Sequence, residues 1–443
     1  MASAVPHLPQ EIINLVIQEL SDDRTTLKAC SAVSSSFREP AQAILFYSIT
    51  ISFPSRDNKR NGELLAILTA HPGIGSYVRW LGLYLEDSFT AGFFASLLRR
   101  FSNVGGLRLI SVYPLQKDWA ILSGPFKAAL LQLLCLPSLT RLDLDYPDFP
   151  FPYLRFCSRL KHLVIHQCVY DNRLQLEDTP EPALVPLLSA AGWPNTDGAQ
   201  QGFLESLDMG TWYALRQVLA AVQHPSSMLS LACLKTFVGK ILEERDIIEI
   251  QNCLALSAPS LRKLSLHVSL SESLQRYPTI PKHSPRCSRL LHKLCRRHFF
   301  GLMLIFRLLS GRWASLYPML SLQPLAALQF LHFSFCLDVV LAAHASTWVC
   351  GLLETIPMHN VLSTIVITAP VLFNVDIVDW GRIDFLSSRE CHRTTLRCVC
   401  IAVAERMEPL VLERMPHLSE KNMIQFLGRG DGEVVGRMLS GLK

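Results

Sequence analysis

Short apolar segments of the form LxxLxL recur along the chain and predict a series of β-strands. The nine clearest copies begin at residues 78, 107, 139, 160, 204, 261, 328, 362 and 396, and a weaker one begins at residue 234. The last two apolar residues of each copy are two positions apart, so they lie on one face of a strand. A strand this short cannot bury that face alone, so successive copies are expected to lie side by side.

Helical patterns separate these strands, for example at residues 61–71, 89–101 and 125–136. Alternating strands and helices predict an α/β fold with parallel strands and right-handed crossovers. The pattern resembles an irregular leucine-rich-repeat domain, which implies a solenoid with its sheet on the concave face and its helices outside. The spacing is uneven, and the asparagine that usually closes the turn after the strand is missing. An ordinary α/β domain with leucine-rich strands is therefore the alternative.

The segment "LPQEIINLVIQEL" (residues 8–20) predicts an amphipathic helix. Two adjacent apolar stripes run along it at helical spacing. One stripe consists of Ile12, Val16 and Leu20, and the other consists of Ile13 and Ile17. Two more short helices are expected by residue 45, the first of them capped by Thr25 or Thr26. Three helices in about forty residues bury little surface by themselves, so one stripe is expected to contact a partner.

These helices resemble an F-box, because "LPQEI" (8–12) and "VSSSFR" (33–38) occur at the separation that this family shows. The continuation "AILFYSITIS" (43–52) is similar to F-box proteins of mushroom-forming fungi, where the third helix leads directly into a strand. The resemblance implies docking on a Skp-type adaptor and, through it, a cullin–RING ubiquitin ligase. The residues onto which the family's adaptor contacts carry over are Leu8, Pro9, Ile12, Val16, Leu20, Leu27, Val33 and Phe37. The alternative is an ordinary helical cap on the domain that follows.

The expected domain organisation follows from these two patterns. Residues 1–46 would form the F-box domain, residues 47–430 the leucine-rich-repeat-like domain, and residues 431–443 a C-terminal tail. Residues 172–202 are rich in Pro, Gly and Asp and predict a loop excursion. Residues 272–316 interrupt the repeat as an insertion.

The positive charge of the chain is concentrated in that insertion. No acidic residue occurs between Glu272 and Asp338, whereas nine Lys and Arg do, and the rest of the chain has 33 basic and 37 acidic residues. A basic patch for acidic partners or nucleic acid, a solvated insertion, and an annotation error such as retained intron sequence all fit this segment. The protein as a whole is not expected to bind nucleic acid.

The thirteen cysteines form no CxxC pair, which favours reduced thiols in a cytoplasmic or nuclear protein. Cys391, Cys398 and Cys400 lie near His392, but no second ligand pair follows at finger-like spacing, so no metal or other cofactor is expected. Neither a signal peptide nor a membrane-spanning helix is expected.

Catalytic motifs are also missing: the sequence has no phosphate-binding loop, no dinucleotide fingerprint, no HExxH and no GxSxG. We therefore expect no enzyme but a substrate-recognition subunit of an SCF-type (Skp adaptor–cullin–F-box) ubiquitin ligase. Its client would contact polar positions between the buried leucines, namely Asp143, Asp145, His162, His166, Asp208, Lys263 and His267. The alternatives are an F-box scaffold without ubiquitin transfer, an enzyme with an unrecognised site, and a degenerate family copy without a client.

Overall fold

The computed structural model describes residues 8–52, 58–85, 91–111, 122–145, 149–166, 201–210, 212–241, 244–269, 320–336, 339–357, 359–369, 378–389 and 395–428. Of the predicted loop at 172–202 only the last two residues belong to this part, and the insertion at 272–316 and the tail at 431–443 lie outside it. The chain divides into two compact units, residues 1–204 with 220–230, and residues 205–219 with 231–443. Helices and parallel strands make up both units, which confirms the predicted α/β class with a large parallel sheet.

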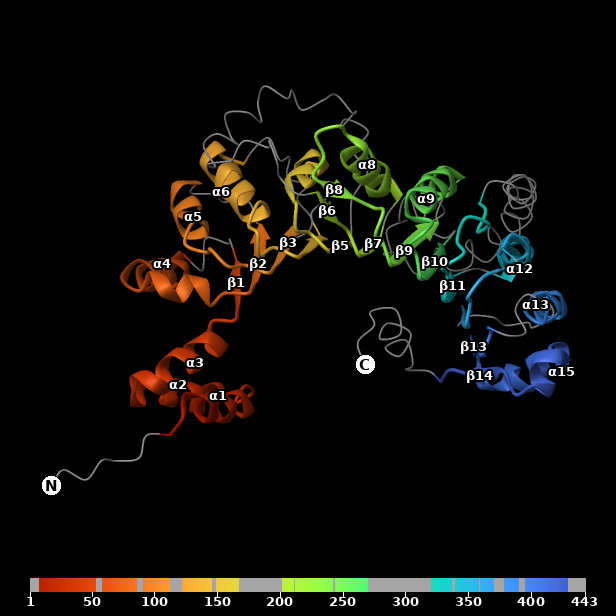
Figure 1. The fold of residues 1–443 in the computed structure, drawn as a ribbon, viewed down its shortest axis with the longest axis horizontal. Coiled ribbons are helices and arrows are strands. Elements are labelled where there is room, and N and C mark those ends of the chain that lie inside the picture. The colour runs from red at the N-terminus through yellow and green to blue at the C-terminus, as the bar shows by residue number, and fades with distance from the viewer. Residues whose placement is uncertain are drawn as a thin grey trace, which may run out of the picture. The chain divides into compact units, whose positions relative to one another are not determined.

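The first unit begins with three short helices, α1 (Gln10–Glu19), α2 (Arg24–Val33) and α3 (Ser35–Leu45), drawn in red at the N-terminal end in Figure 1. Their buried core consists of Ile13, Ile17, Leu27 and Ala41. Five partly buried side chains surround that core: Leu20, Cys30, Phe37, Ile44 and Leu45. The stripe formed by Ile13 and Ile17 is therefore the one that holds the three helices together.

The expected cap of α2 is wrong, because Asp23 and not Thr25 or Thr26 precedes the helix as its N-cap. Its carboxylate accepts hydrogen bonds from the backbone N–H groups of Thr25 and Thr26, each at 3.0 Å, and from the Thr26 hydroxyl at 2.6 Å. The helix begins at Arg24, so both threonines lie in its first turn, where backbone donors need an acceptor from outside the helix. These hydrogen bonds also lower the pKa of Asp23.

Five strands of the first unit pair in parallel and in chain order: β1 (Ser48–Ser52), β2 (Trp80–Leu85), β3 (Gly106–Ser111), β4 (Arg141–Asp145) and β5 (His162–Ile165). Helices α4 (Asn58–Ala70), α5 (Ala91–Leu98) and α6 (Gly124–Leu134) follow the first three strands and lie on one side of them (Figure 1). The remaining elements of this unit are short: η2 (Pro72–Ser76), η4 (Phe151–Phe156), β6 (Gly202–Phe203) and β8 (Leu229–Ser230).

The second unit repeats this arrangement with β7 (Ser206–Met209), β9 (Thr236–Ile241), β10 (Lys263–Ser269), β11 (Phe330–Cys336), β12 (Thr364–Thr368), β13 (Cys398–Ala402) and β14 (Ile424–Phe426). All neighbouring pairs among them are parallel. Between and after these strands the chain forms α8 (Trp212–Gln223), α9 (Glu244–Ser257), α12 (Val339–Glu354), α13 (Trp380–Ser387), η6 (Glu405–Met407), α15 (Glu408–Arg414) and α16 (Pro416–Glu420).

The LxxLxL segments mark the strands of the large sheet from β2 to β13, whereas β14 has no such segment. A strand generally begins two residues after the first residue of a segment, and that first residue is buried in the turn before the strand, as Leu139, Leu261 and Leu362 show. The copy at residue 107 is shifted, because β3 begins at Gly106 and buried Val104 occupies the turn position instead. Burial of these leucines stabilises the packing of each strand against the neighbouring segments of the chain.

Candidate functional site

An exposed apolar surface covers one side of α1. Leu8, Ile12, Leu15 and Val16 recur at helical spacing, and their side chains are 59%, 44%, 59% and 48% exposed. Gln10 Nε2 donates a hydrogen bond to the Ser36 backbone oxygen at 2.9 Å, which holds the first turn of α1 beside the junction of α2 and α3. Val33, at the end of α2, is 72% exposed near that junction. We call these five apolar residues the α1 apolar surface.

The structure divides the predicted adaptor residues between this surface and the internal core. Exposed members of the set are Leu8, Pro9, Ile12, Val16 and Val33. Leu20 and Phe37 are partly buried and pack against the core, and Leu27 lies inside it with 1% exposure. Leu27 therefore cannot reach a partner without opening the three helices. Sequence reasoning missed Leu15, although its position seven residues after Leu8 predicts the same helix face.

On the face of the first unit's strands turned away from the helices, an aromatic ring on β2 lies near a cation and a carboxylate on β4, with a glycine of β3 between them. The Arg141 guanidinium lies 5.5 Å from the centroid of the Trp80 ring. Its Nε and Nη2 donate to the two carboxylate oxygens of Asp143 at 3.0 and 3.3 Å. Gly106 makes this possible, because a Cβ atom there would collide with the Trp80 ring.

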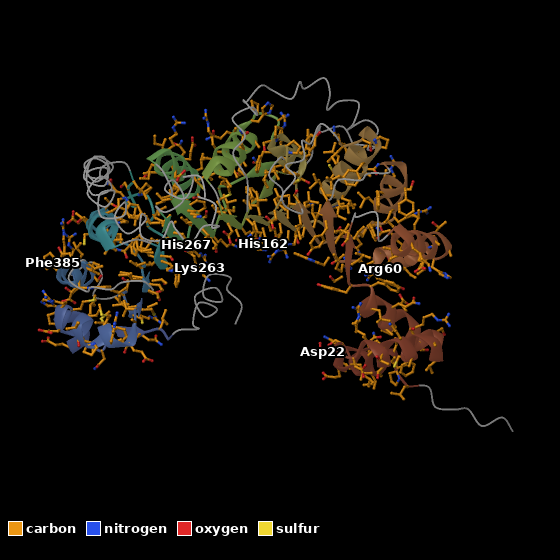
Figure 2. All side chains as sticks on the ribbon, turned by 180° about the vertical axis from the view of Figure 1, so that it is seen from behind. Asp22, Arg60, His162, Lys263, His267 and Phe385 are labelled. Atoms are coloured by element: carbon orange, nitrogen blue, oxygen red, sulfur yellow. The ribbon has the colours of Figure 1, made fainter. Side chains whose placement is uncertain are left out.

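The predicted client residues of this unit have unequal access to solvent. Asp143 is only 5% exposed and is already paired with Arg141, whereas Asp145 is half-buried. His162 and His166 are exposed, and His162 (labelled in Figure 2) pairs with Arg141 in the register of β4 and β5. This strand face therefore offers two imidazoles and a stacked guanidinium, the donor groups and aromatic surface that are common in protein interfaces.

In the second unit, two histidines and two hydroxyls form a chain of hydrogen bonds across β10, β11 and β12. Ser265 Oγ lies 3.2 Å from His267 Nε2 and 2.7 Å from His332 Nδ1, and His332 Nε2 lies 3.1 Å from Thr368 Oγ1. Desolvation lowers the pKa of His267, helped by Lys240, and lowers that of His332 to about 3. Both imidazoles are therefore neutral at pH 7.

This histidine network is closed to substrates. Ser265 is fully buried and His332 is 3% exposed, so their contact does not form an accessible nucleophile and base. The predicted client residues Lys263 and His267 flank Ser265 on β10, and both are half-buried, as is Asp208 on β7. Figure 2 labels Lys263 and His267, of which only His267 belongs to the network. Ser265, His332 and Thr368 were not predicted, because only the register of three strands brings them together.

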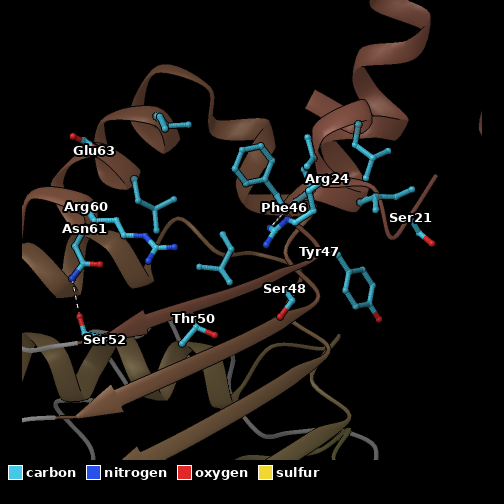
Figure 3. Close-up of a pocket in the computed structure, with 16 residues that line it drawn as sticks. Ser21, Arg24, Phe46, Tyr47, Ser48, Thr50, Ser52, Arg60, Asn61 and Glu63 are labelled. Atoms are coloured by element: carbon cyan, nitrogen blue, oxygen red, sulfur yellow. Dashed lines mark hydrogen bonds between the residues drawn. The ribbon is translucent and has the colours of Figure 1, made fainter. Parts of the chain in front are cut away.

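A cavity of about 850 Å³ opens where α2 and α3 meet β1 and α4 (Figure 3). Leu27, Ile44 and Leu64 contribute apolar walls, and Arg24, Arg60 and Glu63 contribute charges of both signs, which gives no selection for one ligand charge. Arg24 donates to the Leu45 backbone oxygen at 3.3 Å, and Asn61 Nδ2 donates to the Ser52 backbone oxygen at 2.9 Å. The first bond joins α2 to α3 and the second joins α4 to β1, so both hold together the elements that form the cavity wall.

Of the cysteine and histidine group noted in the sequence, Cys391 and His392 lie outside the described residues. Within the described ranges, no group of three or more His, Cys, Asp or Glu side chains is placed to hold a metal ion. No helix in the same ranges is long and apolar enough to cross a bilayer. Neither a scan against models of known protein families nor a search of curated proteins finds a match to this chain.

Proposed function

We propose that this protein is a non-catalytic substrate-recognition subunit of an SCF-type ubiquitin ligase. In this proposal residues 1–46 are an F-box that binds a Skp-type adaptor, and the parallel strands and helices after them are a leucine-rich-repeat-like solenoid that binds a client protein. The observation that carries the proposal is the α1 apolar surface, because it is exposed in a segment whose own core is already complete.

Adjacent apolar residues of α1 differ in burial, and this difference supports an interface on the helix. Ile13 and Ile17 fill the internal core, so folding of the three helices does not require Ile12 and Val16 to be apolar. Burying one large aliphatic side chain on a partner stabilises a complex by roughly 1.5–3 kcal/mol before the costs of association. Three such side chains on one face of α1, together with Leu8 just before the helix, are enough to anchor a helix in a groove.

Client binding is proposed for the strand faces turned away from the helices. Trp80 and Arg141 belong to the residue types that contribute most to protein–protein affinity, and they are held in place by Gly106 and Asp143. A subunit of this kind performs no bond chemistry. It raises the effective concentration of a client beside a ubiquitin-loaded enzyme.

The test is co-expression of the full chain with a Skp-type adaptor, followed by affinity purification. We expect wild type to co-purify with the adaptor and the double variant Ile12→Glu/Val16→Glu to lose it by at least about tenfold, because two charges would be buried in the interface. Ile248→Glu is the matched control, since Ile248 on α9 has the same 44% exposure as Ile12.

Circular dichroism would establish that all three proteins are folded. Equal adaptor binding by wild type and the double variant would overturn the α1 surface as the interface. A folded wild type that does not bind the adaptor at all would overturn the F-box assignment. Adaptor binding without ubiquitin transfer in a reconstituted ligase would identify a scaffold instead of a ligase subunit.

A further inference from the structure

Two cysteines on β13 have their sulfur atoms in contact. Cys398 and Cys400 occupy alternate positions of the strand, so both side chains point to the same face, and their Sγ atoms are 3.3 Å apart. Gln425, which pairs with Cys400 in the register of β13 and β14, places its Oε1 atom 3.6 Å from Cys398 Sγ and 3.8 Å from Cys400 Sγ. Both cysteines are reduced.

The two thiols differ in their access to solvent. Cys400 is 1% exposed and belongs to a buried cluster with Phe330, Val366 and Leu427, whereas Cys398 is half-buried at the edge of that cluster. The hydrogen bond between the two thiols lowers the pKa of Cys398 to about 7 and raises that of Cys400. The more accessible sulfur is therefore the one that ionises first as the pH rises.

The described cysteines elsewhere in the core have the opposite character. Burial raises the pKa of both Cys157 and Cys253 to about 12, which leaves them as inert apolar side chains at pH 7. Cys398 at pH 7 is about half ionised, against about 3% for an ordinary exposed thiol, although its lower basicity makes each thiolate a weaker nucleophile. The net kinetic advantage of Cys398 over an exposed thiol is only about threefold, so its distinguishing feature is the second sulfur beside it.

Joining the two sulfurs requires a local bend in β13. Residues two apart on a strand have Cα atoms about 6.6 Å apart, near the upper limit of roughly 6.8 Å for a disulfide, and their Cβ atoms must approach from a similar separation to roughly 4 Å. A bond formed at that limit is strained, and strained disulfides are the ones that cellular thiols reduce readily. The pair is therefore suited to reversible oxidation and not to a permanent structural bridge.

We propose that Cys398 and Cys400 form a redox modification site that is oxidised by hydroperoxides. The Cys398 thiolate attacks the peroxide, forming an S–O bond and breaking the O–O bond, and the departing hydroxide or alkoxide takes up one proton. The Cys400 sulfur then attacks the Cys398 sulfenic acid, forming the S–S bond, and its proton leaves with the sulfenic hydroxyl as water. Two thiols lose two electrons in total, and one hydroperoxide is reduced.

The sequence provides a clean assay for this reaction. Trypsin cleavage after Arg397 and Arg406 releases residues 398–406, "CVCIAVAER", which contain both cysteines and no other. The full-length chain is reduced, desalted and treated with hydrogen peroxide at pH 7, and free thiols are then alkylated before digestion and mass spectrometry. We expect this peptide to appear unalkylated and lighter by two hydrogen atoms, and a thiol reductant to restore its alkylation. Cys253, in the separate peptide 246–262, should be oxidised at least about tenfold more slowly.

Two variants test the order of the steps. In the variant Cys400→Ser, the sulfenic acid on Cys398 should persist and be trapped by dimedone. In the variant Cys398→Ser, the remaining Cys400 should stay reduced and be alkylated after denaturation. The wild-type measurement does not depend on whether either variant folds. Double alkylation of peptide 398–406 at peroxide levels that oxidise other cysteines of the chain would overturn the proposal, and dimedone labelling of Cys400 instead of Cys398 would overturn the assigned roles.

Discussion

At the scale of single residues, the clearest consequence of burial is the neutral histidine at the centre of the β10–β12 network. His332 receives and donates hydrogen bonds only in its uncharged form, with Ser265 on one side and Thr368 on the other. Its pKa is lowered to about 3, first by desolvation and second by the neighbouring His267, from an ordinary value near 6.5. An unfolded chain therefore binds a proton at this residue below about pH 6.5, and the folded chain does not until about pH 3.

This difference makes stability fall as the solution is acidified from pH 6.5 toward pH 3. At pH 5 the contribution of His332 alone has decreased by about 2 kcal/mol relative to neutral pH. We predict that His332→Gln, which keeps a donor and an acceptor but cannot titrate in this range, loses less stability than wild type between pH 7 and pH 5. Urea unfolding at the two pH values measures this, with His166→Gln as the control at an exposed histidine. Equal losses in wild type and His332→Gln would contradict protonation of His332 as the cause of the acid sensitivity.

At the scale of elements, α16 depends on a carboxylate from another helix. Asp384 on α13 is 1% exposed and accepts hydrogen bonds from the backbone N–H groups of His417 and Leu418 at 3.0 and 2.9 Å and from His417 Nδ1 at 2.7 Å. The two backbone donors belong to the first turn of α16, which has no side-chain cap of its own at Met415. Asp384 thus supplies the missing cap from a distance of 33 residues in sequence.

Removing this carboxylate should destabilise the second unit. Asp384→Ala leaves the backbone donors of His417 and Leu418 without their acceptor, at a cost of about 2–4 kcal/mol. Asp384→Asn keeps one acceptor and should cost less than the alanine variant. Thermal unfolding monitored by tryptophan fluorescence measures the stability of both variants. Asp379→Ala is the comparison, because the exposed Asp379 side chain caps α13 by accepting one hydrogen bond, from the backbone N–H of Arg382. If Asp384→Ala unfolds no earlier than Asp379→Ala, the remote cap is not important.

The elements also show how far the sequence alone could lead. The strands were predictable because leucines that alternate with polar residues can all be buried only if the segment is a strand with one face inward. Leu139, Leu261 and Leu362 also confirm that the first leucine of a segment is buried in the turn before the strand. The two stripes on α1 were visible, but both fit a helix equally well, and only the packing of α2 and α3 decides which one is internal. The Ser265 network and the Asp384 cap could not be predicted, because each depends on residues that the fold brings together from distant positions, 67 residues apart for Ser265 and His332 and 34 for Asp384 and Leu418.

At the scale of the whole molecule, the basic insertion separates two strands that pair directly with each other. β10 and β11 are parallel partners over seven residue pairs, from Lys263 and Phe330 to Ser269 and Cys336. The stretch between them carries nine basic residues and no acidic residue after Glu272, whereas the rest of the chain carries 33 basic and 37 acidic residues. The residues that pair β10 with β11 are therefore outside the segment that gives the chain its net positive charge.

Deletion of residues 273–316 tests whether the fold needs this segment. Residues 270–272 and 317–319 would remain to join β10 to the described chain at Leu320, and six extended residues span about 20 Å. The whole connection to β11 would still have 16 residues, 270–272 and 317–329, more than the dozen or so that a parallel crossover requires. Ser321 N–H would keep its 2.7 Å hydrogen bond to Gln251 Oε1, and Leu322 N–H its 2.9 Å bond to Thr355 Oγ1.

We predict that the deletion variant stays folded and changes its net charge from +5 to −4, since it keeps 33 basic and 37 acidic residues. Circular dichroism and thermal unfolding should match wild type within a few degrees, while retention on immobilised heparin should be lost, because polyanion binding depends on clustered cations. If the variant is instead unfolded or aggregated, the insertion contributes to the core of the protein. Unchanged heparin retention would place the polyanion-binding charge on the strand faces that carry Arg141, Lys240 and Lys263.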